Sequence, residues 1–192
     1  MPMKSLDELG RQFGTDKSTI GHCYTVMYGE RLAPLRDKPI TFLEIGLAGG
    51  KSARMWDAYF THPKARILEM DIEVKAEARV GPYSDRVFLL TGDQGNEADL
   101  RKLARACDGF DVIVDDGGHI ATAQQLSFRL LWPYLRVGGQ YWIEDLETSY
   151  RPFNNRGAAQ STLDMLRGFE RHAHPSTEVI FWLQLCLVLK KA

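Results

Sequence analysis

Residues 40–50 read ITFLEIGLAGG, an apolar run that ends in an acid and a group of glycines. The first seven residues are typical of a buried strand, and the glycines let the backbone approach a ligand without obstruction by a Cβ atom. Residues 52–60, SARMWDAYF, place apolar side chains at helical spacing, and residues 66–71, RILEMD, form a second apolar run. The stretch therefore predicts a strand, a helix and a second strand.

The same alternation continues along the chain. It predicts further strands at 86–93, 110–116 and 140–145, separated by helices at 96–107 and 121–135. Strands that alternate with helices in this way are typical of an α/β fold, in which helices cover both faces of a mostly parallel sheet.

The pattern changes after the fifth strand. Residues 151–157, RPFNNRG, are typical of a loop, and residues 158–174 predict an amphipathic helix. The stretch at 177–192, TEVIFWLQLCLVLKKA, has room for two short strands. We expect them to form an antiparallel pair that closes the sheet, with a turn near Gln184.

Composition favours a compact chain. Of its 192 residues 44% are hydrophobic, and we expect one domain. We divide it into a helical lid segment at 1–38, a cofactor-binding core at 39–150 and an acceptor-side helix with closing strands at 151–192. The formal net charge of −1 gives no overall attraction to nucleic acid or to an anionic membrane.

Cysteines and apolar runs indicate the compartment. Cys23, Cys107 and Cys186 are scattered and form no CxxC pair, which favours reduced thiols over a disulfide framework or a zinc site. The N-terminal residues lack the apolar stretch of a signal peptide, and no run is long enough to span a bilayer. We therefore expect a cytoplasmic protein that does not bind membranes.

Acidic side chains stand at or near the C-terminal end of each predicted strand. They are Glu44, Asp71, Asp93, Asp115, Asp116, Glu144 and Asp145. The carboxyl edge of an open parallel sheet is where ligands bind. We therefore expect a ligand there that is rich in hydroxyls or amines, or that includes a metal ion.

The first strand-to-helix turn favours one class of cofactor. Its pattern is ExGxxGG, whereas dinucleotide-binding enzymes carry GxGxxG. Asp71 is placed to accept hydrogen bonds from ribose hydroxyls, and Asp93 with Gln94 ends the third strand. These features favour S-adenosylmethionine over NAD, although a plain tight turn is the simpler interpretation of the glycines alone.

Together these features resemble the class I methyltransferases, which have a Rossmann-like fold. The resemblance implies that groups after the first strand meet the methionine part of the cofactor, that the acid of the second strand meets ribose, and that the third strand meets adenine. The cofactor-binding residues assigned in this way are Glu44, Gly46, Ser52, Asp71, Asp93 and Gln94, with Asp115 counted beside them. Helix capping is an alternative role for Ser52 and Gln94.

Two motifs, DDGGH at 115–119 and IED at 143–145, indicate the reaction. If their strands are neighbours, the strand ends lie roughly 5 Å apart, and Asp116, Glu144 and Asp145 converge. Packed carboxylates repel one another unless they are protonated or bridged by a cation, and an all-oxygen set suits Mg²⁺ better than zinc. Helix capping by the two aspartates is the alternative.

A metal ion beside a methyl donor suits an alcohol as the acceptor, because an aliphatic hydroxyl is a poor nucleophile until it is polarised. A base must still remove the proton, and His119 can do so near neutral pH. His119 is therefore the candidate general base, against the simpler interpretation that it makes one ordinary hydrogen bond. Nothing in the sequence indicates a catalytic role for the other four histidines.

DDGGH followed by IEDLETSY resembles the metal-dependent sugar O-methyltransferases of macrolide antibiotic biosynthesis, of the mycinamicin and tylosin type. This resemblance implies Mg²⁺ on Asp116, Glu144 and Asp145, with His119 as base. It also implies a small hydroxylated acceptor such as a glycosylated natural product, and it favours a homo-oligomer. Residues 14–17, GTDK, with Tyr24, resemble the segment that closes the cofactor pocket in this group.

Some of these relatives carry an extra N-terminal domain or long insertions around the acceptor, and we expect neither in this protein. The acceptor can therefore differ, and a neighbouring subunit can supply the missing wall. Four side chains after the fifth strand could line the acceptor pocket or form a plain surface loop: Tyr150, Arg151, Phe153 and Arg156.

Three alternatives stay open. The first is a small-molecule methyltransferase without a metal, and the second is a relative of the cephalosporin hydroxylases, which share a similar sheet and similar acidic motifs. The third is a non-catalytic module that binds S-adenosylmethionine. Methylation of nucleic acid is disfavoured, because the sequence has no basic stripe and lacks the motifs of base methylation.

Overall fold

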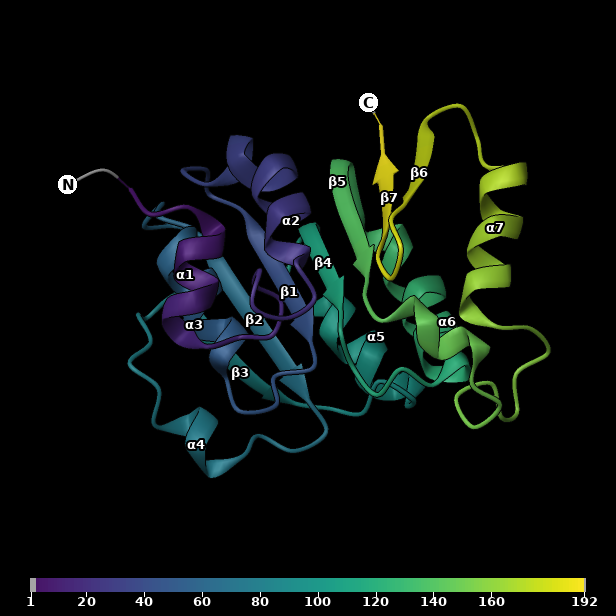
Figure 1. Ribbon diagram of the computed structural model, residues 1–192, viewed down its shortest axis with the longest axis horizontal. Helices are drawn as coiled ribbons and strands as arrows, with labels where there is room; N and C mark the ends of the chain where they lie inside the picture. The colour runs from purple at the N-terminus through teal and green to yellow at the C-terminus, as the bar shows by residue number, and fades with distance from the viewer. Residues whose placement is uncertain (1–2, 192) are drawn as a thin grey trace.

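The computed structural model describes residues 3–191, and its centre is a seven-stranded sheet (Figure 1). The strand order is β3-β2-β1-β4-β5-β7-β6, in which β1 to β5 pair in parallel and β7 pairs antiparallel with β5 and β6. The strands are β1 (Thr41–Ile45), β2 (Arg66–Asp71), β3 (Val87–Thr91), β4 (Phe110–Asp115), β5 (Leu135–Ile143), β6 (Thr177–Phe181) and β7 (Cys186–Lys190). The predicted α/β fold with a closing antiparallel pair is confirmed.

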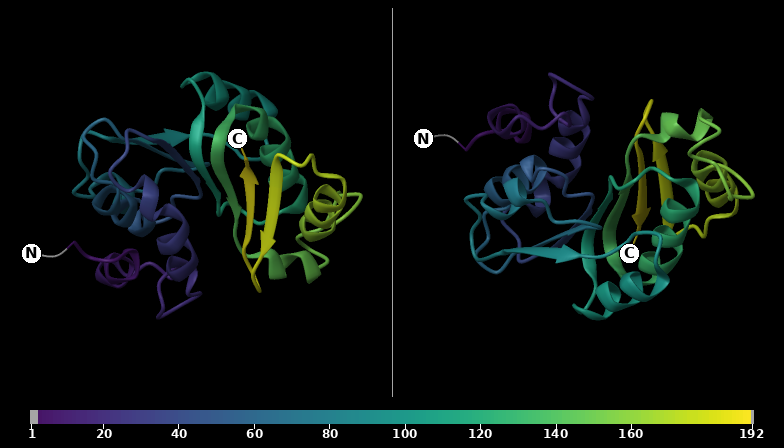
Figure 2. Two further views of the ribbon diagram at one scale, coloured as in Figure 1. Left: turned by 90° about the horizontal axis from the view of Figure 1, so that it is seen from above. Right: turned by 90° about the horizontal axis from the view of Figure 1, so that it is seen from below.

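Helices cover both faces of the sheet (Figure 2). They are α1 (Leu6–Phe13), α2 (Tyr24–Leu32), α3 (Lys51–Tyr59), α4 (Ala76–Arg79), α5 (Glu97–Arg105), α6 (Ala121–Leu131) and α7 (Thr162–His172), with short 3-10 turns at Ala33–Leu35, Trp132–Tyr134 and Leu146–Tyr150. Helices α1, α2 and α3 contribute to the core on one face, and α5, α6 and α7 contribute to the core on the other. Among the helices of residues 3–191, none combines the length and apolarity needed to cross a membrane.

The central strands are apolar on both sides because each side faces a core. In β4, Val112 and Val114 pack on the side of α1 to α3, whereas Ile113 packs on the side of α5 to α7. In β1, Phe42 packs on the side of α1 to α3 and Leu43 packs on the side of α5 to α7. Successive side chains of a strand point to opposite faces, so a strand covered on both faces has a continuous apolar sequence.

Two element boundaries around Pro133 differ clearly from the prediction. Helix α6 ends at Leu131, because Pro133 in the following 3-10 turn has no N–H with which to continue an α-helix. Strand β5 consequently begins at Leu135, five residues earlier than predicted, and its register against β4 shifts between Phe110 and Val112.

The register aligns the strand ends that carry the acidic residues. Ile45 of β1 pairs with Asp115 of β4, which pairs with Ile143 of β5. The residues that follow each strand therefore leave the sheet side by side at one edge, which is where the candidate site lies.

Candidate active site

Two adjoining cavities lie over the carboxyl edge of the sheet. The larger has a volume of about 650 Å³ and runs from the ends of β2 and β3 to the ends of β4 and β5. The smaller, of about 310 Å³, lies between the segment at 14–17 and the turn after β1. Asp16, Gly46, Ala48 and Asp116 line both cavities, which therefore form one continuous recess.

Gly46 allows the turn after β1 to pass close to the loop after β4. Its φ is +105°, a conformation that side chains with a Cβ rarely adopt, and an added Cβ would overlap the carbonyl oxygen of Asp116. Only glycine fits this position without a shift of the backbone. The turn is thus built for close approach between backbone segments at the floor of the recess.

Glu44 and Ser52 bond to each other beneath this turn. Ser52 Oγ donates to Glu44 Oε2 at 2.6 Å, and Trp56 Nε1 donates to Glu44 Oε1 at 3.1 Å. Glu44 is fully buried, whereas Ser52 reaches the wall of the smaller cavity. Because both carboxylate oxygens of Glu44 accept hydrogen bonds from other side chains of the protein, Glu44 supports the turn.

Asp71 and Asp93 line the larger cavity near its β2 and β3 end. Asp71 Oδ2 accepts a hydrogen bond of 2.8 Å from the backbone N–H of Ala48, which ties the end of β2 to the glycine turn. Asp93 Oδ1 accepts one of 2.7 Å from the N–H of Gly95. Each of these carboxylates keeps an edge toward the cavity and can accept hydrogen bonds from a ligand.

Gln94 and Asp115 link the loops after β3 and β4. Gln94 Nε2 donates to Asp115 Oδ1 at 2.6 Å, and Gln94 Oε1 accepts from the N–H of Gly118 at 3.3 Å. Gln94 lines the larger cavity, whereas Asp115 is fully buried behind it. Burial raises the pKa of Asp115 to about 6, against the opposing effect of hydrogen bonds from Ser127 and Gln94.

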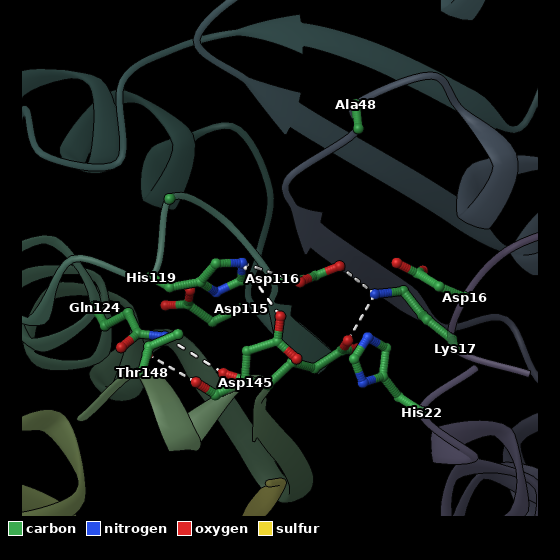
Figure 3. Close-up of polar contacts among 12 residues, drawn as sticks. Asp16, Lys17, His22, Ala48, Asp115, Asp116, His119, Gln124, Asp145 and Thr148 are labelled. Atoms are coloured by element: carbon green, nitrogen blue, oxygen red, sulfur yellow. Dashed lines mark hydrogen bonds and ion pairs between the residues drawn. The ribbon is translucent and has the colours of Figure 1, made fainter. Parts of the chain in front are cut away.

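Asp116, His119 and Asp145 converge at the β4 and β5 end of the same cavity (Figure 3). One ligand atom from each lies within 4.8 Å of the others. His119 Nε2 lies 3.4 Å from Asp145 Oδ2 and 3.8 Å from Asp116 Oδ1. Within residues 3–191, the other ring nitrogen of His119 is buried and has no hydrogen-bond partner.

Backbone conformation directs two of these side chains. His119 and Asp145 both have positive φ values, +52° and +54°, which are uncommon for residues other than glycine. Asn154 Nδ2 donates to the carbonyl oxygen of His119 at 2.8 Å, and Tyr24 OH donates to Asp145 Oδ1 at 2.7 Å. Neighbouring segments thus hold both residues in conformations that cost free energy in isolation.

Glu144, the third carboxylate predicted to bind a metal ion, points elsewhere. Tyr28 OH donates to its Oε1 at 2.6 Å, and Lys17 Nζ donates to its Oε2 at 2.8 Å. Burial and the neighbouring Asp116 raise the pKa of Glu144, while Lys17 opposes the shift. The structure therefore brings two of the three predicted carboxylates together with His119 and places the third against a lysine.

Lys17 is the site residue that sequence reasoning left unassigned. Its ammonium group is buried and forms ion pairs with Asp116, with Glu144 at 2.8 Å and with Glu44 at 3.4 Å. Burial opposes its charge, but these three carboxylates raise the pKa of Lys17 well above its usual value. Lys17 precedes Asp116 by 99 positions in the sequence. The resemblance of the GTDK segment to the segment that closes the cofactor pocket is the one sequence signal that indicated a place for Lys17 near the site.

The donor atoms fit a divalent cation with an oxygen preference. Asp116 and Asp145 offer the carboxylate oxygens that Mg²⁺ binds, whereas imidazole nitrogen is a more usual ligand of transition metals. The fit is therefore best with the two aspartates as ligands and His119 free to exchange a proton. The recess beside them is lined by glycine backbone, by carboxylates and by apolar side chains such as those of Met70 and Ile72.

Comparison with known proteins places the chain in a family. A methyltransferase domain family matches residues 43–146, which is more than half of the chain. The chain belongs to this methyltransferase domain family. Its fold is the Rossmann-like class I methyltransferase fold, and the predicted resemblance is confirmed.

Several curated relatives of this methyltransferase domain are O-methyltransferases. The 8-demethyl-8-(2-methoxy-alpha-L-rhamnosyl)-tetracenomycin-C 3'-O-methyltransferase of Streptomyces olivaceus is 38% identical over 154 residues, which are 77% of this chain and 38% of that protein. The mycinamicin VI 2''-O-methyltransferase of Micromonospora griseorubida is 34% identical over 154 residues, or 77% of this chain and 37% of that protein. The methyltransferase domain thus spans less than half the length of these two relatives.

A solved structure shows the same arrangement of elements. MycE methyltransferase from the mycinamycin biosynthetic pathway, in complex with Mg, SAH and mycinamycin VI, matches with a TM-score of 0.85 and 27% identity. The match covers 98% of this chain and 54% of MycE. A putative O-methyltransferase from Klebsiella pneumoniae, 18% identical with a TM-score of 0.61, shares the fold.

Proposed function

We propose that this methyltransferase domain transfers the methyl group of S-adenosylmethionine to a hydroxyl oxygen of a sugar on a natural product, with the help of Mg²⁺. The observation that carries the proposal is that Asp116, His119 and Asp145 converge on a wall of the same cavity that Asp71 and Asp93 line. The cavity therefore has room for a methyl donor beside a group that can accept a proton. The relatives that methylate glycosylated natural products support this class of acceptor.

The cofactor-binding roles follow from position in the recess. Gly46 lets the methionine part lie close to the backbone, Asp71 accepts hydrogen bonds from the ribose, and Asp93 with Gln94 faces the adenine. Glu44 and Ser52 support the glycine turn, and Asp115 holds Gln94 in place. This assignment keeps all seven predicted cofactor residues in the site but gives Glu44, Ser52 and Asp115 supporting roles.

His119 is the proposed base. Its Nε2 faces the two aspartates and lines the cavity, where it can take the proton of an acceptor hydroxyl. The acceptor oxygen then forms a bond to the methyl carbon, the bond from that carbon to sulfur breaks, and S-adenosylhomocysteine leaves. Alignment of donor and acceptor in the recess supplies much of the rate.

Asp116 and Asp145 are the proposed ligands of Mg²⁺. When bound there, the metal ion would polarise the acceptor hydroxyl and lower the free energy needed to remove its proton. Glu144 could join as a third ligand only by giving up part of its bonding to Lys17 and Tyr28.

One observation favours a second candidate, a methyltransferase that needs no metal. The ammonium of Lys17 already compensates part of the negative charge of Asp116 and Glu144, so a divalent cation is not the only possible source of positive charge at these carboxylates. Methyl transfer that continues at an unchanged rate in a chelator would favour this candidate over the first.

The deciding experiment is isothermal titration of the metal-stripped protein with S-adenosylmethionine, followed by titration of that complex with Mg²⁺. Asp116→Asn is compared with wild type, and His119→Ala is assayed against a panel of glycosylated acceptors. We expect cofactor binding in all three proteins, loss of the Mg²⁺ signal in Asp116→Asn and loss of turnover in His119→Ala. Absence of cofactor binding by wild type would overturn the proposal.

A further inference from the structure

Side chains from the N-terminal part of the chain donate hydrogen bonds to all three acids that directly follow β4 and β5. The pairs are Lys17 Nζ with Asp116 Oδ2, Tyr28 OH with Glu144 Oε1 and Tyr24 OH with Asp145 Oδ1. Each of these acids therefore has at least one carboxylate oxygen held by the protein before a ligand binds.

Tyr24 holds its acid without adding charge. It is the first residue of α2, only 2% of it is exposed, and its ring stacks on that of His22 with centroids 5.2 Å apart. Its hydroxyl donates to Asp145 Oδ1 at 2.7 Å, whereas Gln184 Oε1 lies farther away at 3.4 Å. A phenol is a neutral donor at neutral pH. Within residues 3–191, Asp145 forms no ion pair with a lysine or an arginine, so its negative charge stays available to a cation.

The backbone of Asp145 is fixed as well. Its φ is +54°, and its carbonyl oxygen accepts hydrogen bonds from Thr148, at 3.0 Å from the N–H and at 2.7 Å from Oγ1 (Figure 3). With the backbone held, the hydrogen bond to Oδ1 determines the rotation of the carboxylate. Oδ2 is then left at the wall of the larger cavity, 3.4 Å from His119 Nε2.

The number of free oxygens on a carboxylate affects which divalent cation it suits. Mg²⁺ requires near-ideal octahedral geometry, which favours one oxygen from each carboxylate. Ca²⁺ is larger and takes about six to eight oxygen ligands in flexible geometry, often both oxygens of one carboxylate. A carboxylate with one oxygen already bonded to the protein therefore suits Mg²⁺ better than Ca²⁺.

We propose that Tyr24 is a positioning residue that leaves Asp145 one free oxygen and thereby selects Mg²⁺ over Ca²⁺. This inference rests on the proposed metal-assisted function. Loss of the Tyr24 hydroxyl frees Oδ1, so that both oxygens of Asp145 can bind the same ion. The inference holds whichever other acids complete the metal site.

The test compares wild type with Tyr24→Phe, which keeps the buried ring and removes the hydroxyl. The Kd values of Mg²⁺ and Ca²⁺ are measured by competition against Mn²⁺ in the presence of S-adenosylhomocysteine, with free Mn²⁺ followed by electron paramagnetic resonance. Tyr59→Phe is the matched control, because Tyr59 is equally buried and, within residues 3–191, its hydroxyl forms no hydrogen bond with an acidic side chain. Thr148→Val is the control for a general loosening of Asp145.

We expect the ratio of the two Kd values to move about tenfold toward Ca²⁺ in Tyr24→Phe, a size typical of the loss of a hydrogen bond to a metal ligand. Tyr59→Phe should keep the ratio of wild type. Thr148→Val should weaken the binding of both ions by similar factors, because it releases the backbone of Asp145 without freeing Oδ1.

An unchanged ratio in Tyr24→Phe, or equal weakening of both ions as in Thr148→Val, would overturn the inference and leave the metal-assisted function standing. Wild type that binds none of the three ions would remove that function and the inference with it. Folding is checked by circular dichroism with Ca²⁺ present. A Tyr24→Phe protein that is unfolded under these conditions would show that the hydroxyl serves the fold, which also overturns the inference.

Discussion

At the scale of single residues, Glu69 is a buried acid that the proposed reaction does not use. Its two carboxylate oxygens have no hydrogen-bond partner within residues 3–191, and it pairs in register with Glu44 on the neighbouring strand. Burial and the charge of Glu44 raise the pKa of Glu69 well above its usual value. Glu69 is therefore protonated in the folded protein over a pH range in which the unfolded chain releases the proton.

The raised pKa predicts a loss of stability with rising pH. The folded state binds the proton of Glu69 more tightly than the unfolded state, so the free energy of unfolding decreases from about pH 4.5 up to the raised pKa. Glu69→Gln resembles the protonated acid and should remove this dependence. We expect the variant to gain stability over wild type at about pH 8 and to gain less at about pH 5.5 in urea unfolding. An equal gain at both pH values would contradict the assignment.

Gly46→Ala tests the close approach of two backbone segments. The alanine would adopt a positive φ, at a cost of about 1–2 kcal/mol, and its Cβ would push against the carbonyl oxygen of Asp116. We expect lower stability and at least tenfold weaker binding of S-adenosylhomocysteine by calorimetry. Gly118→Ala is the control for stability, because an added Cβ there meets nothing within 4 Å.

At the scale of elements, the loop at 151–157 holds the loop that follows β4. The side chain of Asn154 donates to the carbonyl oxygen of His119, and the backbone carbonyl of Asn154 accepts a hydrogen bond of 2.8 Å from the N–H of Ala121. Two exposed aromatic side chains, Tyr150 and Phe153, lie near Asn154 in the sequence. The loop is thus joined to the proposed base through one side chain.

Removal of that side chain should affect turnover more than cofactor binding. In Asn154→Ala the carbonyl of His119 loses its donor, and the strained backbone of His119 loses one restraint. We expect kcat to fall about tenfold, the equivalent of ~1.4 kcal/mol in the barrier, with an unchanged Kd for S-adenosylhomocysteine. Asn155→Ala is a suitable control, since Asn155 donates to Ser149 and Arg151. A similar loss of kcat in both variants would contradict a specific role for Asn154.

Part of the site was predictable at this scale and part was not. The order of strands and helices followed from apolar periodicity, and the proximity of Asp116 and Asp145 followed from the pairing of neighbouring parallel strands. The different directions of Glu144 and Asp145 did not follow, because Asp145 has a positive φ that periodicity does not reveal. The ion pairs of Lys17 depend on how the segment at 14–17 packs over the sheet, which no local pattern encodes.

At the scale of the whole molecule, the recess joins the N-terminal segment to the ends of the five parallel strands. A ligand bound in the recess should restrain the N-terminal segment and the strand ends at the same time. We expect S-adenosylhomocysteine to slow hydrogen exchange at 14–17, 46–50, 92–95 and 116–120. Peptides at the opposite ends of the strands serve as the internal control, because the two cavities do not reach them. Protection of the strand ends without protection of 14–17 would show that the segment does not close the recess.

The sheet order gives the last strand an unusual position. Strand β7 ends at Lys190, yet it lies inside the sheet between β5 and β6. Within residues 3–191, β6 pairs with β7 alone. During synthesis on the ribosome, β6 therefore emerges before the strand that must separate it from β5. Until β7 arrives, the outer edge of β5 is open to pairing with β6 or with another chain. The vulnerable period for aggregation is thus the interval between the synthesis of β6 and the synthesis of β7, and a chaperone that covers this edge would act at that time.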